Sequence, residues 1–145
     1  MITADQLLCH AIGDYVLQSD WMANEKTKKS VAALCHVLTY GIPFLFLRPS
    51  WLAMFVIIST HFVIDRWRLA RFVVWAKNFL MPSLWMRGFD PFSEAARKER
   101  DKYAWTNCAA TGYPAVNPAW LSVWLLIIAD NIMHVLINGL ALKYL

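Results

Sequence analysis

The sequence predicts an all-α membrane protein, a polytopic bundle of three to four helices with a cytoplasmic loop or lid. Of its 145 residues, 59% are hydrophobic, a larger share than soluble domains usually carry. The apolar residues form long runs without the alternation typical of half-buried strands, which favours helices. Eight Trp, eight Phe and five Tyr suit a chain with membrane–water interfaces, where aromatic rings accumulate.

We expect residues 1–145 to form a single membrane-embedded helical domain. Its four helical segments are predicted at about residues 3–18, 31–47, 51–79 and 119–145. The first segment is short and polar for a span, so it either crosses the membrane or re-enters it from one side. Residues 81–118 contain Pro, Gly and the charge run EAARKERDK. This composition predicts an irregular loop with a short surface helix at the charge run. A long loop of this kind is a candidate lid over a functional site.

The basic residues predict the orientation of the chain. If the segments alternate in direction, 12 of the 14 Lys and Arg residues fall on one side, and Arg48 and Lys143 fall on the other. The positive-inside rule places the richer side, with the loop 81–118, in the cytoplasm. Membrane topology therefore explains the net charge of +4, and no nucleic-acid partner is expected. The expected partner is the lipid bilayer. The oligomeric state stays open.

The four histidines carry the most specific pattern, because three of them stand four residues from an aspartate. The pairs are His10 with Asp14, His61 with Asp65, and His134 with Asp130. This spacing places both side chains of a pair on one helix face. With seven Asp in the chain, three such pairs would arise by chance in well below about 1% of sequences. An ionisable group at mid-bilayer costs roughly 2.5–3.5 kcal/mol, so these groups predict a functional site.

We expect the His and Asp side chains to meet around a metal ion. The candidate ligands are His10, Asp14, His36, His61, Asp65, Asp130 and His134. Imidazole with carboxylate suits a divalent transition metal, zinc first and manganese or iron as alternatives. Seven ligands exceed one tetrahedral site, so there are either two ions or some groups that orient ligands. Asp14 and Asp65 are the catalytic candidates, with Asp14 as general base because water can reach its short segment.

Other polar residues are candidates for the substrate or for the surroundings of the metal. Gln18 lies one turn beyond Asp14, and Asn131 follows Asp130. Three arginines, Arg66, Arg68 and Arg71, follow Asp65 and are spaced to hold a phosphate or lipid headgroup. The alternative is that these arginines are plain determinants of topology.

The ordered motifs resemble those of a known family. They are HxxxDxxxQxDW from His10 to Trp21, then Lys26, a lone His36, HxxxD at His61 and DNxxH at Asp130. Together they resemble an uncharacterised family, a domain of unknown function, of small bacterial and phage-encoded membrane proteins. They are more loosely similar to LexA-regulated inner-membrane proteins described as metal-dependent hydrolases. The resemblance implies a multi-pass protein of the bacterial inner membrane, a phage source among the possibilities, and adds Lys26 to the candidate site.

The leading functional hypothesis is a membrane-embedded metal-dependent hydrolase of phosphoesters or acyl esters. Its substrate would be a phosphate-containing lipid, or a similar anionic lipid, at the cytoplasmic leaflet. The alternative is a non-catalytic metal-binding membrane protein of a phage or bacterium, with an interaction, anti-host or carrier role. A transporter needs a polar path on both sides of its site, and the outer halves of the predicted segments are almost purely apolar.

Overall fold

The computed structural model describes residues 2–80, 90 and 92–145, and every regular element in those residues is helical. The chain divides into two compact units, one made of Met1–Leu69 with Asp130–Leu145 and the other of Ala70–Ala129. The all-helical fold class is thereby confirmed for the described residues. That residues 1–145 form a single membrane-embedded domain stays a prediction.

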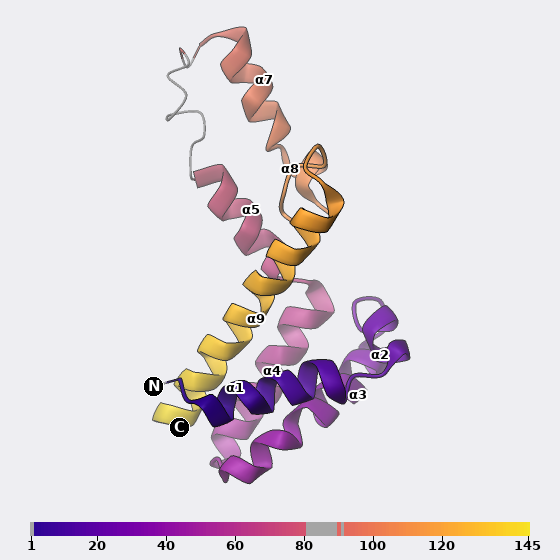
Figure 1. The fold of residues 1–145 in the computed structure, drawn as a ribbon, viewed down its shortest axis with the longest axis vertical. Helices are drawn as coiled ribbons and strands as arrows, with labels where there is room; N and C mark the ends of the chain where they lie inside the picture. The colour runs from indigo at the N-terminus through magenta and orange to yellow at the C-terminus, as the bar shows by residue number, and fades with distance from the viewer. Residues whose placement is uncertain (1, 81–89, 91) are drawn as a thin grey trace. The chain divides into compact units, whose positions relative to one another are not determined.

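The first unit contains every candidate ligand. Its elements are α1 (Ala4–Ala11), η1 (Ile12–Val16), α2 (Asp20–Glu25), α3 (Ser30–Gly41), η2 (Pro43–Leu47), α4 (Trp51–Trp67) and the C-terminal part of α9 (Ala119–Tyr144). The Thr3 side chain caps α1 by accepting from the Gln6 amide at 3.2 Å. Figure 1 shows α1 beside the C-terminal end of α9, where Gln6 Nε2 donates to the carbonyl of Val135 at 2.6 Å. This bond fixes the N-terminal helix to the C-terminal one.

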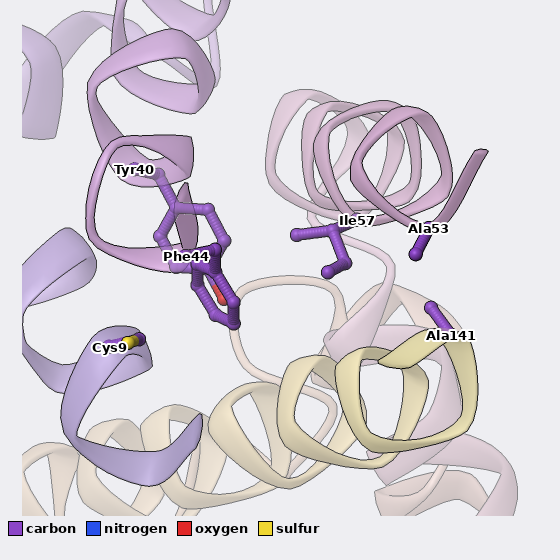
Figure 2. Packing of buried hydrophobic residues seen from close by; sticks show 6 residues of the cluster. All are labelled: Cys9, Tyr40, Phe44, Ala53, Ile57 and Ala141. Atoms are coloured by element: carbon purple, nitrogen blue, oxygen red, sulfur yellow. The ribbon is translucent and has the colours of Figure 1, made fainter. Parts of the chain in front are cut away.

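An apolar cluster joins these helices beside the polar site. It consists of Cys9, Tyr40, Phe44, Ala53, Ile57 and Ala141 (Figure 2). Ala53 on α4 faces Ala141 on α9, and both are almost fully buried. Small residues at such a crossing let two helices approach closely, which brings polar groups one or two turns away within reach of each other.

The predicted helix 51–79 is wrong at one point, because the structure divides it into α4 and α5 (Ala70–Leu80). Arg68 ends α4 in the left-handed conformation, with φ 52°. The amides of Arg68 and Leu69 turn back to the carbonyls of Asp65 and Ile64 at 3.2 and 2.9 Å, which satisfies the end of the helix. No Gly or Pro marks this turn in the sequence. The break places Asp65 in the last turn of α4.

The second unit contains α5, α7 (Glu94–Lys102), α8 (Trp105–Cys108) and the first part of α9. Its aromatic rings hold it together, since Phe72 stacks on Trp105 with ring centroids 4.7 Å apart. The charge run forms α7, as the composition suggested. Residues 81–89 and 91 of the predicted loop lie outside the described residues. The loop's cytoplasmic location and its role as a lid stay predictions.

Two helical stretches among the described residues are long and apolar enough to cross a membrane, Ser30–Leu47 and Ala119–Tyr144. Within the first unit, α9 has one apolar ridge formed by Ile132, Leu136 and Leu140, each at least half exposed. This exposed ridge is what a lipid-facing helix presents. The observations give weak support for a membrane protein. A polytopic bundle of three or four spans stays a prediction.

Gly13 sets the distance between η1 and α3. A Cβ atom at this position would lie 2.5 Å from Tyr40 Cδ2 and 2.9 Å from the Tyr40 carbonyl oxygen. The second of these neighbours is backbone, so a side chain would push η1 away from α3. A Cβ at Gly41 would instead meet the flexible end of the Ile58 side chain, at 3.1 Å from Cδ1.

We therefore predict that Gly13→Ala destabilises the protein by about 1–3 kcal/mol, the usual cost of overpacking. Thermal unfolding in detergent measures this effect. Gly41→Ala is the matched control and should cost clearly less, because Ile58 can move. Equal losses in the two variants would show that the close approach at Gly13 is not what holds η1 in place.

Candidate metal centre

Four buried side chains from three elements converge in the first unit. Asp14 comes from η1, His36 from α3, and His61 and Asp65 from α4. Each offers one donor atom, and the four atoms lie within 4.8 Å of one another. Their side chains are between 0% and 9% exposed. The π-helical turn η1 directs Asp14 toward the histidines, and such turns are frequent at functional sites.

The spacing of the four donor atoms fits a small metal ion. His36 Nε2 and His61 Nε2 are 3.0 Å apart. Each of these nitrogens lies 3.2–3.3 Å from Asp14 Oδ1 and from Asp65 Oδ2. Bond lengths of about 2.0–2.1 Å in a tetrahedral site put the donors roughly 3.3 Å from each other. The five separations that involve a nitrogen therefore match those of a tetrahedral site, and the two oxygens lie within 4.8 Å of each other.

Hydrogen bonds alone do not explain this arrangement. Asp14 Oδ1 is buried and accepts no hydrogen bond of suitable geometry from the described residues, although imidazole nitrogens lie close by. Asp65 Oδ2 is buried too, and its one cationic neighbour among those residues, apart from the imidazoles, is the Lys26 ammonium at 2.7 Å. A neutral imidazole carries one N–H, so one Nε2 cannot donate to two carboxylates and to the other ring. Two buried carboxylates also require positive charge nearby. A divalent cation at the centre satisfies all four donors at once.

The outer nitrogens of the two rings show how the rings are held. His36 Nδ1 and His61 Nδ1 are buried without a hydrogen-bond partner among the described residues. Aromatic packing orients the rings instead, since His61 lies 3.9 Å from the His134 ring and 3.8 Å from the Tyr40 ring. Each unpaired N–H costs about 1–3 kcal/mol. The binding energy of the metal has to exceed this cost.

Lys26 supplies one positive charge at the edge of the group. Its Nζ lies 2.7 Å from Asp65 Oδ2 and 3.3 Å from His36 Nε2. The residue caps the C-terminal end of α2, and its side chain is 19% exposed. The structure thus brings Lys26, which the sequence motifs single out, into contact with the candidate ligands.

The position of Asp14 suits a metal ligand. Its carboxylate is buried, and Oδ1 lies 3.2 Å from His36 Nε2 and 3.3 Å from His61 Nε2. The role of Asp14 as general base, expected from the sequence, stays a prediction.

A second group of donors shares Asp65 with the first. Asp65 Oδ1 lies 3.3 Å from His134 Nε2, which is 3.4 Å from Asp130 Oδ2. The three side chains form a further set that could hold a metal ion. Asp130 is 28% exposed, whereas Asp65 and His134 are almost fully buried. One carboxylate therefore turns one oxygen toward each group.

His10 lies in neither donor group and makes hydrogen bonds to other polar side chains, so its role as a metal ligand stays a prediction. Asn138 Nδ2 donates to the Tyr40 hydroxyl at 2.6 Å, and this hydroxyl lies 2.9 Å from His10 Nδ1. The hydroxyl proton is then free for Nδ1, so the ring carries its own proton on Nε2. That nitrogen lies 2.7 Å from Asn131 Oδ1 and 3.5 Å from Asp14 Oδ2. His10 thus donates to Asn131 and packs beside Asp14.

Sequence reasoning missed Tyr40 and Asn138, although the signal was present. Tyr40 follows His36 by four residues, and Asn138 follows His134 by four residues. The rule that paired His with Asp would have found both if it had been extended to other polar partners. Gln18, which the sequence did single out, has a buried Oε1 without a hydrogen-bond partner among the described residues.

The arginines that follow Asp65 bind backbone groups. Arg66 donates to the Thr27 carbonyl at 2.7 Å and to Ser30 Oγ at 3.2 Å. It thereby fastens the loop between α2 and α3 to α4. Arg71 belongs to the second unit and donates to the Ala109 carbonyl at 3.1 Å. Arg68 forms the turn after α4. A role of these side chains in holding a lipid headgroup stays a prediction.

These features define a helical protein whose buried histidines and aspartates could hold a metal ion. Residues 2–86 match the family described as protein of unknown function (DUF3307), and the chain belongs to that family. The predicted resemblance to an uncharacterised family is confirmed, while the phage or bacterial source stays a prediction. Neither the curated proteins nor the solved structures gave a match. The matched range includes the four convergent donors, and Asp130 and His134 lie beyond it.

We predict that the purified protein binds at least one transition-metal ion per chain, and that the double variant His61→Ala, Asp65→Ala binds none. The variant removes one nitrogen and one oxygen donor from a four-donor site. Elemental analysis of detergent-purified protein gives the stoichiometry.

His10→Ala is the matched control for this prediction. It removes a buried histidine that lies beside Asp14 but belongs to neither donor group, so metal should be retained with an affinity at most about 10–100-fold lower. Wild-type protein that carries no metal and takes up none on titration would refute the site. Complete loss of metal in His10→Ala would instead make His10 a ligand.

Proposed function

We propose that the protein is a metal-dependent hydrolase of the bacterial inner membrane, acting on a phosphate-containing lipid at the cytoplasmic leaflet. The observation that carries the proposal is the buried set of nitrogen and oxygen donors within an apolar helical chain. A divalent ion held there would lower the pKa of a water molecule and polarise a phosphoryl oxygen. The donor set favours zinc, with manganese or iron as alternatives.

A lipid phosphate suits the surroundings of the donors better than a soluble metabolite. Lys26 lies beside the first group and is partly exposed, so its ammonium is available to a phosphate oxygen. The first unit presents large apolar side chains at its surface, for example Ile132 and Leu140. These side chains suit contact with acyl or polyprenyl chains. The positive-inside count favours access from the cytoplasm.

The reaction proposed is hydrolysis of a phosphoester. A water oxygen attacks phosphorus, the ester P–O bond breaks, and the departing lipid oxygen takes up a proton from solvent. The proton lost by water passes to solvent, which reaches the partly exposed side chain of Asp130.

The orientation of the chain can be tested with a cysteine introduced at Ala95, an exposed position in α7. With Cys9, Cys35 and Cys108 replaced by alanine, a membrane-impermeant thiol reagent should not label this site in intact cells. Permeabilised cells serve as the control and should show labelling. Strong labelling in intact cells would reverse the orientation and move the proposed substrate to the other leaflet.

Turnover can be tested on a panel of phosphatidate and polyprenyl phosphates in nanodiscs, with phosphate release as the readout. We expect activity from the metal-loaded protein, and a loss of two or more orders of magnitude in Asp65→Asn. Leu38→Ala, at an exposed site on α3, is the matched control and should stay active. Metal-loaded protein without turnover on any substrate would favour the alternative, a non-catalytic metal-binding membrane protein.

A further inference from the structure

The Asp65 carboxylate faces two donor groups with different oxygens, and we infer that the protein binds two unequal metal ions bridged by this residue. A closed site consists of Asp14, His36, His61 and Asp65 Oδ2. An open site consists of Asp65 Oδ1, Asp130 and His134. The assignment of catalysis to the open site rests on the proposed function, whereas the number of ions does not.

The closed site has no position left for substrate. The two histidine nitrogens lie 3.0 Å apart and 3.2–3.3 Å from each carboxylate oxygen, all four donor atoms lie within 4.8 Å of one another, and all four side chains are buried. Four protein donors complete a tetrahedral shell. Four protein ligands are characteristic of ions that hold structure together. The ion in this site therefore ties η1, α3 and α4 to one another.

The open site has three protein donors. Its two measured separations, 3.3 Å from Asp65 Oδ1 to His134 Nε2 and 3.4 Å from that nitrogen to Asp130 Oδ2, match donors around one small ion. Three protein ligands and one vacant position are characteristic of catalytic zinc sites. Asp130 is the most exposed of the three side chains. Water or a substrate oxygen can complete the coordination of this ion.

The stacking of two histidine rings is a second observation, separate from the carboxylate of Asp65, that places the two donor groups next to each other. His61 belongs to the closed site and His134 to the open site. Their rings are nearly parallel, tilted by 24°, with centroids 3.9 Å apart. Each ring directs its Nε2 toward one group, so the stacked rings hold the two donor groups side by side. Paired catalytic ions are usually about 3.5–4 Å apart.

The net charge of the donors predicts that the open-site ion binds with lower affinity than the closed-site ion. With the imidazoles neutral, as metal binding requires, three carboxylates and Lys26 leave two net negative charges, which one divalent ion balances. A second ion then adds two positive charges that the protein does not compensate. A phosphate dianion between the ions restores neutrality. The open-site ion should therefore bind more tightly when phosphate is present.

Titration of demetallated wild-type protein in nanodiscs with Mn²⁺ tests the pair, with free Mn²⁺ followed by electron paramagnetic resonance. We expect two ions per chain at saturation, a spin-coupled signal, and at least a tenfold tightening of the weaker ion by inorganic phosphate. Saturation at one ion, or two ions without coupling, would overturn the inference.

Variants assign the ions to the two sites. His134→Ala and Asp130→Ala should each bind one ion, without a spin-coupled signal and with an affinity that phosphate does not change. Asp130→Ala keeps the test valid if His134→Ala does not fold. Leu136→Ala, an exposed position on the same helix, should still bind two. Two coupled ions in Asp130→Ala and in folded His134→Ala would contradict the open site. If the protein binds one ion and still hydrolyses lipid phosphates, the inference of an ion pair is wrong and the proposed function stands. If it binds two coupled ions but hydrolyses no lipid phosphate, the proposed hydrolase is wrong and the ion pair stands.

Discussion

The fold of the first unit depends on bringing two carboxylates and two imidazoles together in an apolar interior. Asp14 and Asp65 are both buried, and each lies 3.2–3.3 Å from the Nε2 atoms of His36 and His61. Two buried carboxylates destabilise a protein unless positive charge compensates them. Lys26 supplies one such charge, and a divalent ion would supply the remainder. Metal binding and folding are then linked, because the same side chains hold three elements together.

The helices are arranged so that this meeting is possible. The π-helical turn at η1 carries Asp14, and Gly13 lets that turn pack directly on Tyr40. Helix α4 ends at Arg68, which leaves Asp65 in its last turn. Polar contacts from Tyr40 hold His10, which in turn faces Asp14. The local geometry of η1 and α4 thus determines which atoms the donors present to one another.

The sequence predicted the helical class and the convergence of His and Asp, because the i,i+4 spacing and the apolar runs are local properties. It could not predict the π-helical turn, because Gly13 by itself does not distinguish a π-helical turn from a continuing α-helix. It could not predict the break at Arg68 either, because no Gly or Pro stands at that turn. It also could not distinguish a member of a donor group from a residue beside it. His10 and His61 look alike in sequence, and only the long-range contacts of His10 with Tyr40 and Asn131 separate their positions.

X-ray absorption spectroscopy at the metal edge of the purified, metal-loaded protein tests the central claim most directly. The geometry predicts only nitrogen and oxygen neighbours at about 2.0–2.1 Å, with multiple scattering from at least two imidazoles. Sulfur neighbours at about 2.3 Å would place the ion on the cysteines instead. A shell of oxygen alone, without imidazole scattering, would equally contradict a site built on His36 and His61.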